Sequence, residues 1–296
     1  MAKNQRSLLL GAHMSVEGGF EKAIQRGESI NCNTIQIFTK SNRQWNAKPI
    51  SDEQAKLFKQ AHQESLIGPI VAHGTYLINI GSADQELSHK SAQAVIMELE
   101  RCDQLGIHYF VLHPGSSVNA TEAQCLQRIS DNLNDILSKT KSKTILLLEN
   151  MAGQGSVVCH KFEQLKTIHD QLEFKNRVGY CFDTCHAFAA GYDFRTTATY
   201  ERMWKEFDDI LGISNLKAIH INDSKKELGS RVDRHEEIGK GQLGLEAFSL
   251  LFNDERFYDI PKILETPKDD LSDYAHNMEV IKGLISSHTK KQLGME

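Results

Sequence analysis

Eight short apolar runs, separated by segments of helical periodicity, constrain the fold of this chain more than any other feature of its sequence. Most of the runs lack polar alternation, which is typical of parallel strands that are buried on both faces. They read LLLGAH (8–13), TIQIFT (34–39), PIVAHG (69–74), YFVLHP (109–114), TILLLEN (144–150), GYCFDT (179–184), KAIHIND (217–223) and KILET (262–266). Between them, apolar residues recur at every third or fourth position, which predicts helices over 51–65, 88–105, 121–139, 161–173, 199–211 and 245–252.

Strand alternating with helix eight times predicts an α/β protein built as a single (β/α)8 TIM barrel, with its active site at the C-terminal face of the strands. An open, doubly wound sheet is the alternative, but no GxGxxG motif follows the first run. No linker or low-complexity segment divides the 296 residues, so we expect one domain over 1–296. We expect the last residues, from about 287 to 296, to form a frayed tail.

Composition excludes several classes of protein. The chain is 40% hydrophobic and 25% charged, as globular proteins are, and it lacks the run of roughly 18 apolar residues that a membrane span needs. Its start does not resemble a secretory signal, and its six cysteines form no CxxC pair, so we expect a cytoplasmic protein with reduced thiols and no membrane contact. The net charge of −5 means that binding to nucleic acid would need a local source of positive charge.

Histidine and acidic residues follow the apolar runs more often than chance allows. With 39 Asp and Glu and 13 His in the chain, eight strand ends should carry about one or two of these residues. Seven of the eight ends carry one, namely His13, His73, His113, Glu149, Asp183, His220 and Glu265. Because the C-terminal ends of barrel strands converge on one face, these side chains are expected to meet. Imidazoles and carboxylates gathered in one pocket indicate a site for divalent metal ions.

Two loops extend this set of candidate ligands. His186 lies three residues beyond Asp183, and Asp233 and His235 form an extended pair that a Gly-rich, flexible stretch follows. With His13 left out, five His, two Asp and two Glu remain, which is more than one ion of four to six ligands can use. We therefore expect two or three metal ions.

Eight segments resemble the endonuclease IV family of apurinic/apyrimidinic endonucleases. They are AHGTYLINIGS (72–82), VLHPGS (111–116), LLLENMAGQG (146–155), FDTCHAFAAGYD (182–193), IHINDSK (219–225), DRHEEIGKG (233–241), ILETP (263–267) and, as a DNA-contacting loop, FTKSNRQW (38–45). The resemblance runs from Gly11 to at least Pro267, with the segments in the order and spacing of the family. It implies a single (β/α)8 barrel that holds three Zn2+ ions per chain.

The resemblance also implies which residues hold each ion. His73 and His113 would hold one zinc, and Glu149 would bridge it to a second. Asp183, His220 and Glu265 would complete the second position, while His186, Asp233 and His235 would hold the third. Glu149 and Glu265 are the expected catalytic carboxylates. Three Zn2+ ions would take the formal net charge from −5 to +1, with the gain focused on one face.

The function implied is DNA repair, with duplex DNA that contains abasic sites or blocked 3′ ends as the partner and no obligate protein partner. The family hydrolyses the phosphodiester 5′ to an abasic site to leave a 3′-hydroxyl, and it removes 3′-blocking groups. Paired metal ions suit this chemistry because a zinc-bound hydroxide between them can act as nucleophile without a protein base. Arg43 and Tyr76 are candidates to enter the minor groove, and Trp45, Lys225 and Arg234 are further candidates for contact with DNA.

Other interpretations stay open at this stage. Sugar isomerases and epimerases also use barrels with metal sites, but theirs are typically dominated by carboxylates, whereas five His and a loop with Lys, Arg and Trp favour the nuclease. A non-catalytic metal-binding or DNA-scaffold protein is the third possibility. His13 has no place in the implied ligand set and is expected to support the ligands or to be structural. Cys181 is expected to point into the barrel from a deeper layer, and neither Cys181 nor Cys185 is expected to bind metal.

Overall fold

The computed structural model describes residues 8–295, and eight parallel strands form a closed barrel in it, in the order β1-β10-β7-β6-β5-β4-β3-β2. The predicted TIM barrel is confirmed, and all eight apolar runs form its strands. The strands are β1 (Leu10–His13), β2 (Thr34–Phe38), β3 (Ile70–His73), β4 (Tyr109–Leu112), β5 (Ile145–Glu149), β6 (Val178–Asp183), β7 (Leu216–Ile221) and β10 (Lys262–Leu264). A short antiparallel hairpin, β8 (Asp223–Ser224) with β9 (His235–Glu236), follows β7.

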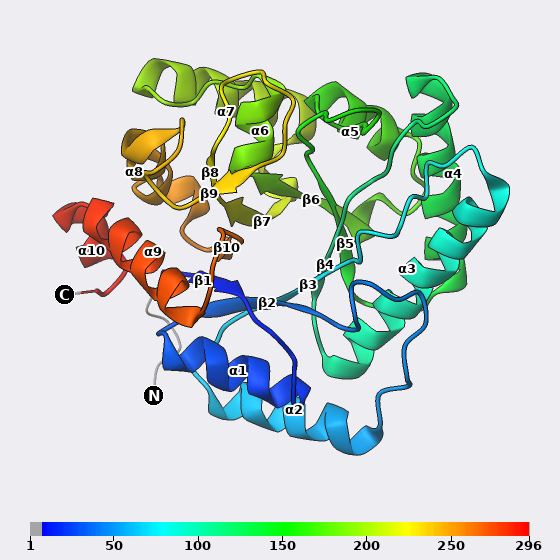
Figure 1. The fold of residues 1–296 in the computed structure, drawn as a ribbon, viewed down its shortest axis with the longest axis horizontal. Coiled ribbons are helices and arrows are strands. Elements are labelled where there is room, and N and C mark those ends of the chain that lie inside the picture. Colours follow the sequence, from blue (N-terminus) through cyan, green and yellow to red (C-terminus); the bar gives the residue numbers. More distant parts are fainter. Residues whose placement is uncertain (1–7, 296) are drawn as a thin grey trace.

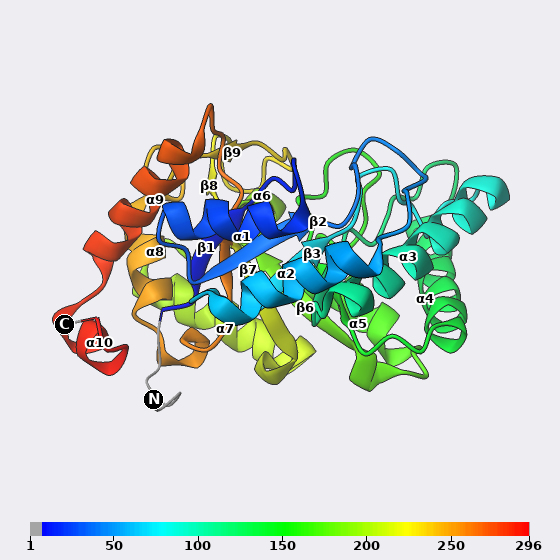
Figure 2. The same ribbon diagram turned by 90° about the horizontal axis from the view of Figure 1, so that it is seen from below.

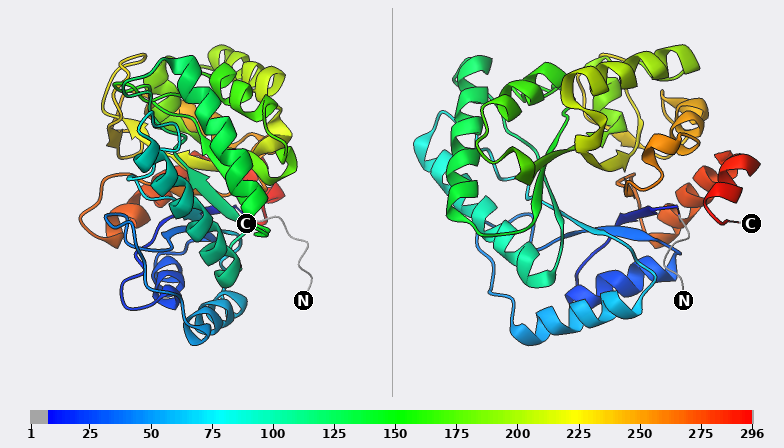
Figure 3. Two further views of the ribbon diagram at one scale, coloured as in Figure 1. Left: turned by 90° about the vertical axis from the view of Figure 1, so that its right-hand side faces the viewer. Right: turned by 180° about the vertical axis from the view of Figure 1, so that it is seen from behind.

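Helices surround the barrel on its outside (Figure 1). They are α1 (Phe20–Ser29), α2 (Asp52–Glu64), α3 (Gln85–Leu105), α4 (Glu122–Lys139), α5 (Phe162–Asp170), α6 (Thr184–Ala190), α7 (Thr197–Leu211), α8 (Gly244–Phe252), α9 (Leu271–Leu284) and α10 (Ser287–Gln292), with 3-10 turns at Lys175–Arg177, Ile213–Asn215 and Glu255–Phe257. The six predicted helices are present, and α1, α6, α9 and α10 are additional. Figure 3 shows the same ring of helices from the side and from behind.

Local sequence signals begin several of these helices. Ser51 accepts a hydrogen bond from the backbone of Gln54, whose side chain accepts one from the backbone of Ser51, and Thr121 and Gln124 form the same capping box before α4. Such caps satisfy amides that have no partner inside the helix. At the start of α6 the cap is Asp183, which accepts from the amide of His186 at 2.7 Å. One candidate ligand thus orients the start of the helix that carries another.

The barrel has a small apolar interior beneath its C-terminal face. Val71, Val111, Leu147, Cys181 and Ala218, from five consecutive strands, pack together and are at most 1% exposed. Each lies two residues before a candidate ligand, and because side chains alternate along a strand, the ligand points inward one layer higher. The expectation that Cys181 faces inward from a deeper layer is confirmed. Figure 2 shows that the loops after β1, β2 and β7 gather on one side of the barrel.

The expectation of a frayed C-terminal tail is wrong for residues 287–295. Residues 287–292 form α10, which Ser286 caps by accepting from the amide of Thr289. The hydroxyl of Tyr258 hydrogen-bonds to the side chains of Thr289 and Gln292, each at 3.1 Å, and Leu293 is buried. A buried phenol and an apolar anchor therefore order a segment whose polar composition resembles a tail. Within residues 8–295, no helix combines the length and the hydropathy needed to cross a bilayer.

Candidate metal centre

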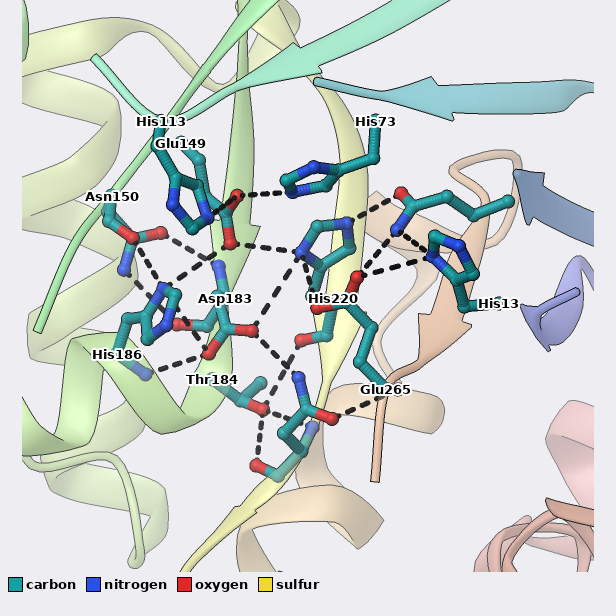
Figure 4. A network of polar contacts seen from close by, with 12 residues as sticks. His13, His73, His113, Glu149, Asn150, Asp183, Thr184, His186, His220 and Glu265 are labelled. Atoms are coloured by element: carbon teal, nitrogen blue, oxygen red, sulfur yellow. Dashed lines mark hydrogen bonds and ion pairs between the residues drawn. The ribbon is translucent and has the colours of Figure 1, made fainter. Parts of the chain in front are cut away.

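Six of the nine candidate ligands lie at the C-terminal ends of barrel strands and point toward one another (Figure 4). His73, Glu149 and Asp183 are the last residues of β3, β5 and β6. His113 and Glu265 directly follow β4 and β10, and His220 is the penultimate residue of β7. The parallel register puts these ends at one rim, with Asp183 paired to His220. The remaining three, His186, Asp233 and His235, come from α6 and from the loop that ends at β9.

Glu149 is fully buried at the centre of this cluster, and its two oxygens face different imidazoles. Oε2 lies 3.3 Å from Nε2 of His73 and 3.1 Å from Nε2 of His113. Oε1 lies 3.0 Å from Nδ1 of His220 and 3.3 Å from Nδ1 of His186. A carboxylate whose oxygens divide in this way is suited to bridge two metal ions.

The second group consists of Asp183, His220 and Glu265 together with Glu149. Each offers one ligand atom, and the four atoms lie within 4.8 Å of one another. Nδ1 of His220 lies 3.3 Å from Oε2 of Glu265 and 3.8 Å from Oδ2 of Asp183. Three carboxylates around one imidazole would repel one another without a cation between them. This donor set fits a divalent ion with nitrogen and oxygen ligands.

The third group consists of His186, Asp233 and His235. Asp233 places Oδ2 3.2 Å from Nε2 of His186 and Oδ1 3.3 Å from Nε2 of His235. Both Nε2 atoms are buried and make no hydrogen bond. A buried polar atom without a partner costs about 1–3 kcal/mol, so two of them aimed at one carboxylate fit a site that a metal ion completes. Cys185 also lies close to Asp233 and His235, but burial raises the pKa of its thiol to about 12, which disfavours the thiolate that zinc binds.

Hydrogen bonds to the outer nitrogens orient the imidazoles. The Nδ1 atoms of His73, His186 and His235 lie 2.7 Å, 3.0 Å and 3.1 Å from the backbone carbonyls of Gly74, Asn150 and Glu265. A carbonyl can only accept, so Nδ1 carries the proton in each and Nε2 keeps its lone pair for a metal. This arrangement is typical of metal-binding histidines.

Gln36, on β2, is a functional residue that the sequence analysis missed. It is fully buried, its Oε1 lies 2.9 Å from Nε2 of His220, and its Nε2 donates to Oε1 of Glu265 at 2.6 Å. The proton that His220 donates to Gln36 leaves Nδ1 free to bind a metal. The signal was present in the sequence, because the run TIQIFT is the one apolar run without a His, Asp or Glu at its end and has a glutamine in its middle.

Asn222 and His13 also support the ligands. Asn222 donates to Oδ2 of Asp183 at 2.7 Å and accepts from the amide of Glu265 at 3.0 Å. Nδ1 of His13 lies 3.1 Å from Nε2 of Gln36 and 3.8 Å from Oε1 of Glu265, and its ring packs against Phe38. His13 thus contacts Glu265 and its partner Gln36, which agrees with a supporting role.

The cluster holds Glu149, Asp233 and Glu265 ionised. Burial alone would raise the pKa of Glu149, but the imidazoles of His220 and His113 bring it well below its ordinary value. Burial would also raise the pKa of Asp233, but His186 and His235 outweigh this effect and lower it to about 2. The pKa of Glu265 is also lowered, chiefly by His220 against the effect of burial. Anionic oxygens at neutral pH are the form that binds a metal ion.

The candidate DNA contacts differ in their accessibility. Arg43 and Tyr76 are exposed on the loops after β2 and β3, and the Tyr76 ring lies 5.7 Å from that of His113. Trp45 is half-buried, with the ammonium of Lys90 4.7 Å above its ring.

The remaining two candidates lie around the hairpin after β7. Lys225 is exposed and lies 3.8 Å from Glu236, while Arg234 donates to the carbonyl of Asp233 at 2.7 Å. The DNA-binding role of all five residues stays a prediction.

Buried charges hold the loop that carries Arg43. Arg101 of α3 donates to the carbonyls of Thr39 and Lys48, and Gln104 donates to that of Ile50. Glu98, fully buried on the same helix, accepts from the hydroxyl of Thr39. The loop after β2 is therefore fixed at both of its ends by one face of α3.

Comparison with known proteins identifies the family. Residues 24–284 match the family of xylose isomerase-like TIM barrels. A probable endonuclease 4 of Chloroflexus aurantiacus is 45% identical over 277 residues, which span 93% of this chain and 97% of that protein. An apurinic-apyrimidinic endonuclease of Caenorhabditis elegans is 45% identical over 265 residues, which span 88% of this chain and 67% of that protein. The crystal structure of endonuclease IV from Thermus thermophilus superposes with a TM-score of 0.82 at 32% identity and covers 93% of this chain and 98% of its own. The chain therefore belongs to the endonuclease IV family.

Proposed function

We propose that this chain is a zinc-dependent endonuclease of DNA repair that hydrolyses the phosphodiester 5′ to an abasic site in duplex DNA and leaves a 3′-hydroxyl. Removal of blocking groups from 3′ ends is the second proposed activity, because it breaks the same kind of bond. The observation that carries the proposal is the convergence of five imidazoles and four carboxylates at one end of the barrel, with two buried Nε2 atoms that make no hydrogen bond. The names of the relatives from Chloroflexus aurantiacus and Caenorhabditis elegans support the same reaction.

Three Zn2+ ions are the proposed cofactors. His73 and His113 would hold the first, Asp183, His220 and Glu265 the second, and His186, Asp233 and His235 the third, with Glu149 shared by the first two. When bound, zinc supplies a nucleophile at neutral pH by lowering the pKa of a water molecule, and it stabilises the attacking and leaving oxygens of the phosphodiester. Glu149 and Glu265 would serve catalysis by holding these ions and offsetting part of their charge.

The protein's own side chains would bring the substrate to this site. Tyr76 and Arg43 stand exposed on neighbouring loops, Tyr76 beside His73 and His113, so both can enter a minor groove that is docked over the cluster. Extruding a nucleotide costs least where the base is already missing, which favours abasic sites as the target. Lys225, Arg234 and Trp45 are proposed to contact the DNA backbone around the site. The whole chain has a formal net charge of −5, and bound zinc would offset it locally, on the face that meets DNA.

A sugar isomerase or epimerase is the main rival because such enzymes also place metals in barrels. The composition of the cluster opposes it. The three metal positions proposed here would use five imidazoles in all, and the loops beside them expose Arg43 and Tyr76.

The deciding experiment is incision of a duplex with a single abasic analogue by the purified chain alone, before and after chelation and after zinc is restored. We expect one cut 5′ to the lesion, loss of cutting on chelation, and recovery with zinc. A duplex of identical sequence without the lesion is the control. Absence of incision by protein that carries its full metal content would overturn the proposal.

A further inference from the structure

The Gly-rich stretch after His235 is hydrogen-bonded to one buried carboxylate, that of Asp223. This residue begins β8 and is fully buried. Its Oδ2 accepts from the amides of Gly239 at 3.0 Å and Gly241 at 3.1 Å, and its Oδ1 accepts from those of Ser224 at 2.7 Å and Leu243 at 2.9 Å. Hydrogen bonds from four backbone amides satisfy a charge that would otherwise be costly to bury. The sequence analysis expected a flexible stretch, whereas the structure gives it a fixed partner.

The glycines are required by this contact. A Cβ on Gly241 would overlap Oδ1 of Asp223 and the carbonyl oxygen of Ser224, so that only a glycine lets the backbone approach so closely. Gly239 has a φ of 80°, in the left-handed region that glycine adopts without strain. The segment is therefore built to enclose the carboxylate, and its residues are not merely a tolerant linker.

The enclosed carboxylate holds the base of the loop that carries two candidate ligands. In the β8–β9 hairpin, Ser224 pairs with His235, and the amide of Lys225 donates to the carbonyl of Arg234 at 2.9 Å. The loop begins after Asp223 and Ser224 and returns to the hairpin through Asp233 and His235. The turn after the hairpin then donates its backbone amides to Asp223 itself. The far end of the loop is held elsewhere, since the amide of Arg231 donates to the carbonyl of Ala189 in α6 at 2.8 Å.

We propose that Asp223 is a positioning residue that sets the zinc affinity of the third metal position by fixing the 225–243 loop, so that Asp233 and His235 face His186. The inference rests on the proposed function for the presence of that zinc. Asp223 itself is enclosed by backbone amides and is not a ligand. Groups that orient ligands without touching the metal typically change metal affinity by about 10- to 100-fold.

The test is the substitution Asp223→Asn, which preserves shape but leaves only one oxygen to accept from four amides. Zinc affinity is measured by competition with a chelator of known strength. We expect one of three zinc equivalents to bind at least about tenfold more weakly, with the other two changed by less than about twofold. Three equivalents with the affinities of the parent would overturn the proposal, and so would an equal weakening of all three, which indicates a general structural defect.

Three further variants guard against misfolding or provide matched controls. Gly241→Ala leaves the carboxylate in place but blocks the approach of the backbone, and it should weaken the same single zinc. Gly283→Ala, at a helical glycine with open space around it, and Asp209→Asn, at an exposed aspartate of α7, should leave all three zincs unchanged. If Gly241→Ala binds three zincs like the parent, the proposal is wrong even where Asp223→Asn fails to fold.

Amide hydrogen exchange of the metal-free protein separates this inference from the proposed function. Peptides that cover residues 225–241 should exchange at least about tenfold faster in Asp223→Asn and Gly241→Ala than in the parent, while barrel peptides stay unchanged. Unchanged exchange in the loop would refute the positioning role. A parent protein that holds fewer than three zincs would instead contradict the proposed function, and the exchange measurement would still decide the role of Asp223.

Discussion

Nδ1 of His220 lies 3.0 Å from Oε1 of Glu149, which joins the ends of two strands that are not neighbours in the barrel. Both side chains are fully buried. Gln36 holds the opposite edge of the imidazole through Nε2, so His220 presents Nδ1 to the carboxylate. The contact places a carboxylate oxygen and an imidazole nitrogen side by side at the centre of the cluster.

We expect about three zinc equivalents per chain, because nine candidate ligand side chains converge in overlapping groups at one end of the barrel, which is more than one ion can use. The measurement is elemental analysis of purified protein after reconstitution with zinc and removal of excess metal. One equivalent or none would contradict the assignment of the nine ligands.

Glu265→Gln should lower single-turnover incision by roughly 100-fold or more while much of the affinity for DNA remains. Oε2 of Glu265 lies 3.3 Å from Nδ1 of His220, and its Oε1 accepts from Gln36. The amide keeps the shape but loses the charge and part of the ligand strength, so metal content is measured alongside. Glu279→Gln, at an exposed residue of α9, is the control. Incision within threefold of the parent would remove Glu265 from the catalytic set.

Replacing both Arg43 and Tyr76 with Ala should weaken binding and cutting of an abasic duplex by about tenfold or more, with metal content and melting temperature unchanged. Stacking and groove contacts of these side chains would offset the few kcal/mol that extrusion of the nucleotide costs. The defect should shrink on a nicked or frayed duplex, because distortion costs less there.

This comparison is made under single-turnover conditions at fixed salt, since phosphate contacts make affinity depend on salt. Arg202→Ala, at an exposed arginine of α7, is the control for loss of a positive charge. Equal defects on the intact and the nicked duplex would refute insertion into the groove, and no defect on either would remove both residues from the DNA interface.

The stability of the metal-free protein should fall as the pH rises above about 6.5. Burial lowers the pKa values of His186 and His220. Asp183 outweighs this effect at His186, and Cys181 and Glu265 outweigh it at His220, so that both pKa values are raised well above 6.5. A raised pKa contributes stability that is complete below the unfolded value and is lost as the pH passes through the folded value. The lowered pKa values of Glu149 and Asp233 act in the opposite direction, since their contribution is lost as the pH falls, for Asp233 toward its pKa of about 2.

Thermal unfolding in the presence of a chelator, followed from pH 4 to pH 9, tests this prediction. The zinc-loaded protein should behave differently above pH 6.5, because metal binding requires deprotonated imidazoles and gains strength as the pH rises. A chelated protein that becomes steadily more stable from pH 6.5 to pH 9 would show that these imidazoles are neutral when the metal is absent.

The number of barrel strands, their places along the chain and the residues at their ends could all be read from the sequence. The physical reason is that buried parallel strands need short, continuous apolar runs, and that a side chain two residues beyond an interior one must face the same way. Val71 and His73, or Leu147 and Glu149, display this spacing in the printed sequence. Likewise, the motif resemblance was sufficient to name all nine candidate ligands before any geometry was known.

Which atoms meet could be learned only from the folded chain. Gln36 is near in sequence to none of the ligands that it orients, and its bonds to His220 and Glu265 exist because β2 closes the barrel beside β1 and near β10. The bond from Tyr258 that orders α10, and the amides of the Gly-rich stretch that enclose Asp223, likewise join residues that are 16 or more positions apart. Periodicity reports which way a side chain points from its own strand, whereas the partner that it finds depends on the closure of the barrel and the path of the loops.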